Sequence, residues 1–221
     1  MRINKKIIYN YKKPLIIAEI SGNHAGNKKR FLKLIKGAFS YGADLVKIQT
    51  YEPIDITLKK KDKNFKINSG PWKNMYLWDL YKKASTPFNW HKEAFDIAKK
   101  FNKKIFSSPF SLRAVDLLEK FKCPIYKIAS FEITDFKLIR YIASKNKKII
   151  LSTGMSTISE IKKALKIINK YHNNVAILHC VSDYPTEINN SNLKKILKLK
   201  KIFPNNEIGL SDHTNGIATS I

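Results

Sequence analysis

The chain contains seven short, largely apolar runs rich in β-branched residues, and polar side chains follow each run directly. Such runs are typical of strands that are buried on both faces of a parallel sheet. Segments with helical spacing of apolar residues separate the runs, which predicts alternating strands and helices with right-handed crossovers. The runs, each with the polar residues that follow it, are 15–18 (Glu19), 43–46 (Lys47, Gln49), 104–106 (Ser107, Ser108), 124–126 (Lys127, Ser130), 148–151 (Ser152), 175–178 (His179) and 207–210 (Ser211, Asp212, His213).

These polar residues all lie at the same end of the predicted strands, and a closed barrel would gather them around one mouth. An open nucleotide-binding sheet has no support, because the chain has neither a Gly-x-Gly-x-x-Gly nor a Gly-x-x-x-x-Gly-Lys motif. We therefore predict an α/β fold of the TIM (β/α)8 barrel type. With about seven strands in 221 residues, we expect an incomplete barrel whose eighth β/α unit is missing, so that the chain is a fragment or a partner completes it.

The chain is strongly basic, with 42 Lys and Arg against 17 Asp and Glu and a formal net charge of +25. A basic nucleic-acid-binding protein is one alternative that this balance raises. However, only four of the basic residues are arginines, and the lysines are scattered over the helical segments. Arg binds phosphates and base edges better than Lys, because its planar guanidinium donates two parallel hydrogen bonds. We therefore expect the lysines to lie on solvated outer faces of the helices, and we expect no specific nucleic-acid partner.

Cys123 and Cys180 lie far apart and show no metal-ligand spacing, so we expect two free thiols in a reducing compartment. The basic N-terminus precedes an apolar run that stops at Glu19, which is too short for a signal-peptide core or a membrane span. These features favour a cytoplasmic protein without a membrane partner.

The segment 51–85 is much longer than an ordinary connection between a strand and a helix. It contains Gly70-Pro71-Trp72 and an apolar patch from Leu77 to Tyr81. We expect an insertion that serves the active site, and a hairpin is one form that it can take.

Segments at the predicted strand ends resemble the sialic acid synthase family, in order and over nearly the whole chain. They include Ala-Glu-Ile-Ser-Gly-Asn-His at 18–24 and Ser-Asp-His at 211–213. The matching segments are 18–24, 42–51, 107–110, 126–130, 151–155, 179–186 and 209–214. Within the family, segments 23–26, 77–81, 86–91 and 129–133 resemble the pseudaminic acid synthase branch more than the N-acetylneuraminate branch.

The resemblance implies an enzyme, a C–C bond-forming transferase. It would condense phosphoenolpyruvate with a diacetamido-trideoxy hexose (6-deoxy-AltdiNAc) and give pseudaminic acid and phosphate. An N-acetylneuraminate or legionaminate synthase, which takes another N-acetylated amino sugar, is an alternative. An inactive, truncated barrel is a second one, because the eighth strand is expected to be missing.

The residue types at the strand ends suit this chemistry. Lys47 and Lys127 are cations for a highly anionic substrate, although ion pairing with Glu19 or Glu132 would also explain a buried lysine. Hydroxyls donate to phosphate and carboxylate oxygens, although a single serine equally often caps a helix. The resemblance implies catalytic roles for Glu19, Lys47, Lys127 and His213, with Glu19 the candidate general acid or base. It implies substrate binding by Asn23, Gln49, Ser108, Ser130, Glu132, Ser152, Ser182, Tyr184 and Ser211.

The resemblance also implies a divalent metal, Mn²⁺ or Mg²⁺, held by two histidines. His213 is one of them, with help from Asp212 if that carboxylate reaches the ring. The other belongs to a Glu-Lys-His motif on the eighth strand. Family members carry a C-terminal antifreeze-like (SAF) domain that reaches across a homodimer. We expect residues 1–221 to be a partial TIM-barrel synthase domain without the SAF domain, and the full-length protein to be a homodimer.

Overall fold

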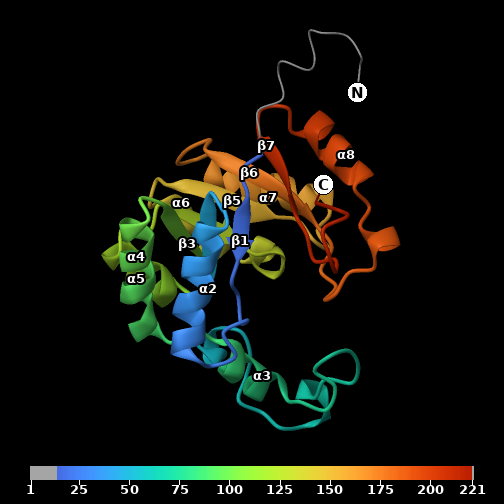
Figure 1. Ribbon diagram of the computed structural model, residues 1–221. Helices are drawn as coiled ribbons and strands as arrows, with labels where there is room; N and C mark the ends of the chain where they lie inside the picture. The colour runs from blue at the N-terminus through green and yellow to red at the C-terminus, as the bar shows by residue number, and fades with distance from the viewer. Residues whose placement is uncertain (1–13, 221) are drawn as a thin grey trace.

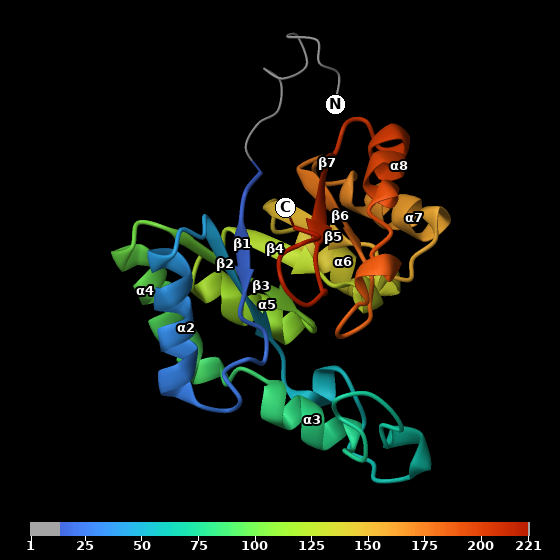
Figure 2. The ribbon, with the colours of Figure 1, turned by 45° about the vertical axis from the view of Figure 1, so that its right-hand side comes forward.

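The computed structural model describes residues 14–220, and these residues form one parallel sheet of seven strands in the order β1 to β7. Every neighbouring pair is parallel, so each connection is a crossover. The sheet curls until its edge strands, β1 and β7, come to the same side of the molecule (Figures 1 and 2). The prediction of an incomplete TIM-type barrel is therefore confirmed for the described residues. The strands are β1 (Ile17–Glu19), β2 (Leu45–Thr50), β3 (Lys104–Pro109), β4 (Ile125–Ile128), β5 (Lys148–Ser152), β6 (Val175–Cys180) and β7 (Glu207–Ser211).

Six helices follow the strands and cover the outer face of the sheet (Figure 2). Several begin at a polar N-cap whose side chain accepts a backbone N–H, as Asn27, Ser111 and Asp135 do. Thr157 and Glu160 form the capping box that their spacing predicts. These helices are α2 (Lys28–Ser40), α4 (His91–Lys100), α5 (Leu112–Lys120), α6 (Phe136–Ala143), α7 (Ile158–Ile168) and α8 (Lys194–Ile202).

The apolar core lies between the sheet and these helices. On β2, Val46 and Ile48 are fully buried and pack in one cluster with Phe31 and Ile35 of α2. Successive strand residues point to opposite faces, so Lys47 and Gln49 point to the inner face of the curl. The outer face therefore provides much of the hydrophobic stabilisation. The inner face carries polar groups toward the carboxyl ends of the strands, together with buried apolar residues such as Phe106 and Ile150.

The insertion between β2 and α4 lies at the carboxyl ends of the strands (Figure 2). It contains two short 3₁₀ turns, η1 (Pro53–Asp55) and η2 (Lys63–Phe65), and helix α3 (Leu77–Ala84). A single antiparallel bridge pairs Lys66 with Tyr76, and no hairpin strands form within this described segment. The apolar patch that the sequence suggested for a hairpin is thus a helix at the mouth of the barrel.

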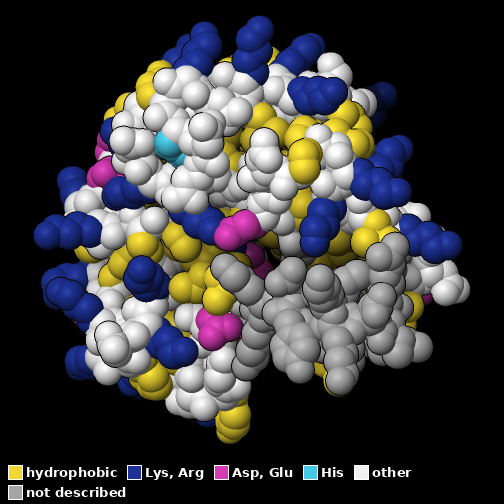
Figure 3. Space-filling model, turned by 90° about the horizontal axis from the view of Figure 1, so that it is seen from above, with side chains coloured by type: hydrophobic (Ala, Val, Ile, Leu, Met, Phe, Trp, Pro, Cys, Tyr) yellow, Lys and Arg dark blue, Asp and Glu magenta, His cyan; other side chains and the backbone are white. Residues whose placement is uncertain are grey.

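Basic side chains are spread over the surface. On the face opposite α3, Lys and Arg lie along the top, left and right of the view and do not form one patch (Figure 3). None of the helices between residues 14 and 220 is long and apolar enough to cross a membrane. Cys123 and Cys180 are both buried and unpaired, as predicted.

Candidate active site

The strand register brings the predicted residues to one face of the sheet. Glu19 is in register with Lys47, Gln49 with Ser108, and Cys180 with Ser211. Because residues in register on parallel strands point to the same side, the register can be followed from strand to strand across the sheet. The inner face then carries Glu19, Lys47, Gln49, Ser108, Lys127, Ser152, Cys180 and Ser211.

Glu19 and Lys47 form an ion pair at the ends of β1 and β2. The Lys47 ammonium is 2.7 Å from Oε2 of Glu19, and the lysine side chain is only 3% exposed against 42% for the glutamate. Oε1 of Glu19 accepts hydrogen bonds from the backbone N–H and the hydroxyl of Ser21, at 3.0 and 2.9 Å. The lysine is thus buried and the carboxylate that pairs with it faces the opening.

Lys127 and Glu132 have strongly altered proton affinities. Burial, with the nearby charge of Lys47, lowers the pKa of Lys127 to about 8, although Glu19 and Glu132 act in the other direction. Burial raises the pKa of Glu132 to about 7. The Oε2 atom of Glu132 is buried and has no hydrogen-bond partner among the described residues. Glu132, which the sequence suggested only as a binding residue, is therefore the carboxyl that holds a proton near neutral pH.

Polar atoms from three strand ends meet around Gly154. The Ser130 hydroxyl accepts the Gly154 N–H at 3.0 Å and is 3.4 Å from Sγ of Cys180, which is 4.0 Å from the Ser182 hydroxyl. A Cβ atom on Gly154 would lie 2.2 Å from Oγ of Ser182 and 2.9 Å from Sγ of Cys180. Only glycine fits here, because any side chain would enter the space between these groups.

Two further inner-face hydroxyls are buried without a partner in residues 14–220. Ser108 is 0% exposed and Ser152 is 1% exposed, and neither Oγ atom has a hydrogen bond within the protein. An unpaired buried hydroxyl is unfavourable, so such a group marks a place where a bound molecule supplies the missing partner. Ser211 and Gln49 share this face and are half-buried, whereas Asn23 is exposed in the loop after β1.

His213 is held with one ring nitrogen available. Its Nδ1 donates to the carbonyl oxygen of Val181 at 2.6 Å, which leaves Nε2 as the unprotonated nitrogen of the neutral ring. Burial lowers the pKa of His213, and Lys127 adds to this effect. The ring of Tyr184 lies against it, with centroids 4.2 Å apart.

Asp212 makes no hydrogen bond to the ring of His213 among the described residues, so the condition for its supporting role is not met. Its carboxylate instead accepts hydrogen bonds from the backbone N–H and hydroxyl of Thr214 and from the hydroxyls of Thr219 and Ser220. These bonds lower its pKa to about 2, against the opposing effect of burial. Asp212 shapes the turn after β7, and Val181 is the group that orients His213.

His213 fits the role of one metal ligand, because a neutral imidazole whose second nitrogen is hydrogen-bonded is the usual form of a ligating histidine. Within residues 14–220, no group of three His, Cys, Asp or Glu side chains could hold a metal ion together. The described residues thus provide one candidate ligand, and the rest of a coordination shell would come from other groups.

The other buried histidines serve the fold. His179 points to the outer face, and its Nε2 is 2.7 Å from the carbonyl oxygen of Ser191. His24 packs edge-on against Phe31 and Trp90. His91 is completely buried and bonded to neighbouring polar groups. Both His24 and His91 therefore contribute to packing at the base of the insertion.

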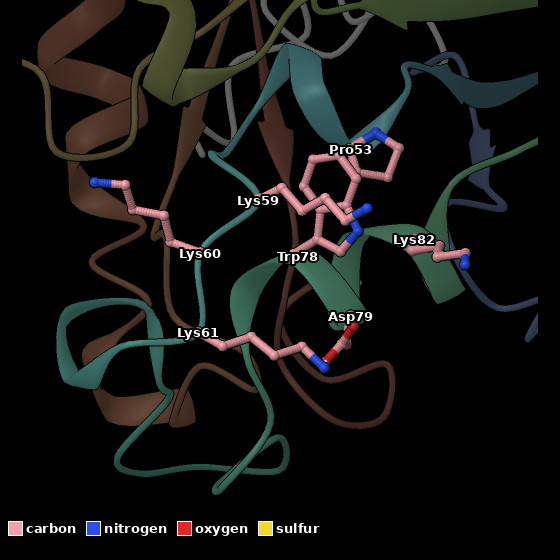
Figure 4. A pocket seen from close by; sticks show the side chains of 7 residues that line it. All are labelled: Pro53, Lys59, Lys60, Lys61, Trp78, Asp79 and Lys82. Carbon is pink, nitrogen blue, oxygen red and sulfur yellow. The ribbon is translucent and has the colours of Figure 1, made fainter.

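A cavity of about 340 Å³ lies on the insertion rather than at the inner face. The Lys59 side chain lies over the ring of Trp78, and Lys61 points toward Asp79 (Figure 4). Pro53, Lys60 and Lys82 complete its lining. It contains none of the predicted site residues, so we place the candidate site at the inner face, where the unpaired polar groups lie.

Fold and site together define the class: a TIM-type barrel protein whose mouth carries two lysines, a protonatable carboxyl and several hydroxyls. The NeuB family model matches residues 34–221, and the chain belongs to the NeuB family. It is 45% identical over 204 residues to a pseudaminic acid synthase of Helicobacter pylori, covering 92% of this chain and 60% of that protein. It is 40% identical to an N,N'-diacetyllegionaminic acid synthase of Campylobacter jejuni, covering 95% of this chain and 64% of that protein.

A solved N-acetylneuraminic acid synthetase from Leptospira borgpetersenii has the same architecture. It superposes with a TM-score of 0.83 at 29% identity, over 94% of this chain and 68% of that chain. The chain spans about 60% of the length of the pseudaminic acid synthases that it matches.

Proposed function

We propose that this chain forms the catalytic barrel of a synthase that condenses phosphoenolpyruvate with a diacetamido-trideoxy hexose to give pseudaminic acid. C3 of phosphoenolpyruvate attacks the aldehyde carbon, water adds at C2, and phosphate leaves with cleavage of its bond to C2. One water is consumed, and the aldehyde oxygen gains a proton. The observation that supports this most is the set of inner-face cations and unpaired hydroxyls in a chain of the NeuB family.

In this proposal Lys47 and Lys127 bind the carboxylate and phosphate of phosphoenolpyruvate, because charge-assisted hydrogen bonds to such oxygens are strong. The hydroxyls of Ser108, Ser130 and Ser152 donate to the same oxygens. Ser182 and Ser211 complete this binding surface. The two buried, unpaired hydroxyls then acquire the partners that they lack in the protein alone.

Glu19, Gln49, Tyr184 and Asn23 contact the acceptor sugar through its hydroxyl and acetamido groups. Glu19 holds Lys47 and faces the opening, which suits a group that meets both substrates. Glu132 is protonated over part of the neutral range, because its pKa is about 7. We assign to it the delivery of a proton to the aldehyde oxygen as the new bond forms.

His213 would hold a divalent metal through Nε2. When bound, such an ion supplies a Lewis acid that polarises an aldehyde oxygen. The protein's own contribution is the orientation of the ring by Val181 and by the packing of Tyr184.

The test is phosphate release from phosphoenolpyruvate, measured with the diacetamido hexose, with the legionaminic acid precursor and with N-acetylmannosamine, each with Mn²⁺ or Mg²⁺. We expect the highest kcat/KM with the diacetamido-trideoxy hexose, and a loss of roughly 100-fold or more in Lys127→Met. Lys33→Met, on the exposed surface of α2, is the matched control and should leave the rate unchanged. Release of phosphate with none of the three acceptors would refute the proposal, and preference for another acceptor would reassign the substrate.

A further inference from the structure

The end of the insertion is fixed to the loop that follows β1. Gly22 packs against the last residue of α3 so closely that a Cβ atom on it would lie 3.0 Å from Cβ of Ala84. Two residues on, the completely buried His24 contacts the Thr86 hydroxyl through Nε2 at 3.2 Å. Nδ1 of His24 accepts the N–H of Gly26, so Nε2 carries the proton and donates it to Thr86.

A second buried imidazole holds the next residue of the insertion. Nδ1 of His91 donates to the carbonyl oxygen of Pro87 at 3.2 Å, and Nε2 is 2.8 Å from the Thr50 hydroxyl. Thr50 is in turn 2.6 Å from the Ser107 hydroxyl, which connects the ends of β2 and β3. The residues that directly follow α3 are therefore held against the barrel by two hydrogen-bonded imidazoles. This fixes the position of the last turn of α3 relative to the strands.

This anchoring determines where Tyr81 of α3 lies. Its ring meets the ring of Tyr51 edge-on, with centroids 6.2 Å apart. Tyr51 is only 3% exposed and packs in the same way against Phe110, at 5.2 Å. Tyr51 follows β2 and Phe110 follows β3, so Tyr81 lies on a wall made by the carboxyl ends of two inner strands.

The phenol of Tyr81 lies near the candidate site, because Tyr51, on which its ring packs, comes two residues after Gln49. Burial raises its pKa, and the nearby carboxylate of Glu132 adds to the effect. Tyr81 also lies close enough to Tyr184 to contribute to the raised pKa of that phenol, after burial and the effects of Cys180, Glu19 and Glu132. Tyr81 is thus within electrostatic range of Tyr184 and Glu132, while its ring is fixed on Tyr51 at the carboxyl end of β2.

We infer that Tyr81 contacts the acceptor sugar and determines its specificity, an inference that rests on the proposed function. An aromatic ring with a polar tip suits an N-acetylated sugar, because the ring packs on C–H groups and methyls while the hydroxyl binds a polar substituent. The ring of Tyr81, held on the wall that Tyr51 and Phe110 form, provides such a surface. Phosphoenolpyruvate, with neither an apolar face nor an acetamido group, lies against the lysines and serines instead.

The experiment compares Tyr81→Phe and Tyr81→Ala with the unchanged protein, using full kinetics for both substrates and two acceptors that differ at an acetamido group. We expect KM for the acceptor to rise about tenfold in Tyr81→Phe, as loss of a buried hydrogen bond predicts, and further in Tyr81→Ala. KM for phosphoenolpyruvate should change less than twofold. The ratio of the kcat/KM values for the two acceptors should move closer to one. Tyr41→Phe is the matched control, because Tyr41 is 94% exposed at the end of α2.

Two outcomes separate this inference from the proposed function. If the unchanged protein releases no phosphate with any acceptor, the proposed function fails, and the inference fails with it. If the unchanged protein is active while both Tyr81 variants keep its acceptor KM and preference, the inference alone is wrong. A parallel rise in both KM values with a lower melting temperature would show a purely structural role and would also overturn it.

Discussion

At the residue scale, Lys47 and Glu19 are unequal partners in their ion pair. The lysine is buried and the glutamate is almost half exposed. Removing the charge of the buried partner leaves a carboxylate that water can solvate, whereas removing the other charge leaves a buried ammonium without a partner. The two neutralising substitutions should therefore affect stability differently, although both affect activity.

We expect Lys47→Met to change the free energy of unfolding by less than about 1 kcal/mol, because its apolar side chain fits a buried site. Glu19→Gln should destabilise the protein by about 1–3 kcal/mol, since it leaves the ammonium of Lys47 unpaired. Urea unfolding of both variants measures the difference. A larger loss in Lys47→Met than in Glu19→Gln would contradict this account, and phosphate release should fall at least about 100-fold in Lys47→Met.

The titration of Lys127 should make KM for phosphoenolpyruvate rise with pH. Its pKa is about 8, so the ammonium is fully charged below about pH 7 and loses its proton as the pH rises through 8. Since the charged form binds phosphoenolpyruvate, KM for this substrate should rise by up to tenfold per unit above pH 8. The comparison variant is Lys127→Arg, whose guanidinium stays charged throughout. Its KM for phosphoenolpyruvate should be flat between pH 7 and 9.5, and a rise like that of the unchanged protein would assign the titration to another group.

Gly154 allows a third residue-scale prediction. A methyl group at this position would occupy the space beside Ser182, Cys180 and Ser130. Gly154→Ala should raise KM for phosphoenolpyruvate at least about tenfold and destabilise the protein by about 1–3 kcal/mol through overpacking.

The matched control for this substitution is Gly37→Ala. Gly37 lies inside α2, with no atom within 4 Å of an added Cβ, so the change should stabilise the protein by about 0.5–1 kcal/mol and leave KM unchanged. Equal melting temperatures and equal KM values for the two variants would mean that the hydroxyls around Gly154 do not bind phosphoenolpyruvate.

At the scale of elements, the strands and the presence of the insertion could be predicted from the sequence, whereas the helix inside the insertion could not. Each predicted strand is present within a few residues of its expected limits, because its apolar run is short, rich in β-branched residues and flanked by helical segments. Helix α3 has no side-chain cap at Tyr76 and no fully buried residue. Helix α3 is held by contacts between residues that are distant in the sequence, such as Gly22 and Ala84. Contacts of this kind leave no local pattern in the sequence of the helix.

The same contrast applies to the site. Inner-face residues such as Lys47 and Ser152 were predictable, because strand alternation alone determines where they point. Tyr81 was missed as a site residue, since its place depends on how the insertion folds back. The roles of Asp212 and Val181 were missed for a similar reason, because the turn after β7 decides which group reaches the ring of His213.

The anchor of the insertion leads to a prediction at this scale. Thr86→Val removes the hydroxyl that receives the His24 proton and leaves a buried N–H without an acceptor. We expect the insertion to open more often, so that trypsin cleaves at the exposed Lys59, Lys60 and Lys61 roughly fivefold faster under native conditions.

Ser85→Ala is the control for this experiment, because within residues 14–220 the Ser85 hydroxyl bonds to the Lys82 carbonyl of the same turn and to no other group. Its cleavage rate should match that of the unchanged protein. Equal rates in Thr86→Val and Ser85→Ala would show that the hydrogen bond between His24 and Thr86 does not restrain the insertion.

At the scale of the whole molecule, the strand order and the curl of the sheet follow from the alternation of strands and helices and from the handedness of their connections. The choice between related acceptors does not follow from these features. It depends on a few side chains at the mouth, and relatives that are named for different sugars match this chain at 45% and 40% identity. Architecture is thus determined by many residues at once, and specificity by a small number that the loops position.

The net charge of +25 is also a property of the whole molecule. Lysines spread over the surface create a positive field that attracts an anion from a distance, and salt weakens this field within a Debye length of about 8 Å at 0.15 M. Phosphoenolpyruvate is highly anionic, and the proposed amino-sugar acceptor is neutral. We therefore expect kcat/KM for phosphoenolpyruvate to fall about three- to tenfold between 50 and 500 mM KCl, because steering of charged ligands is strongly salt dependent.

Under saturating phosphoenolpyruvate, kcat/KM for the neutral acceptor should change less than twofold over the same range. The measurement to compare is the fold-decrease of kcat/KM for phosphoenolpyruvate against that for the acceptor. A general effect of salt on the protein would lower both kcat/KM values by the same factor. Equal decreases would show that the surface lysines serve solubility alone. A decrease confined to phosphoenolpyruvate would show that a charge distributed over the entire surface contributes to substrate capture at one mouth.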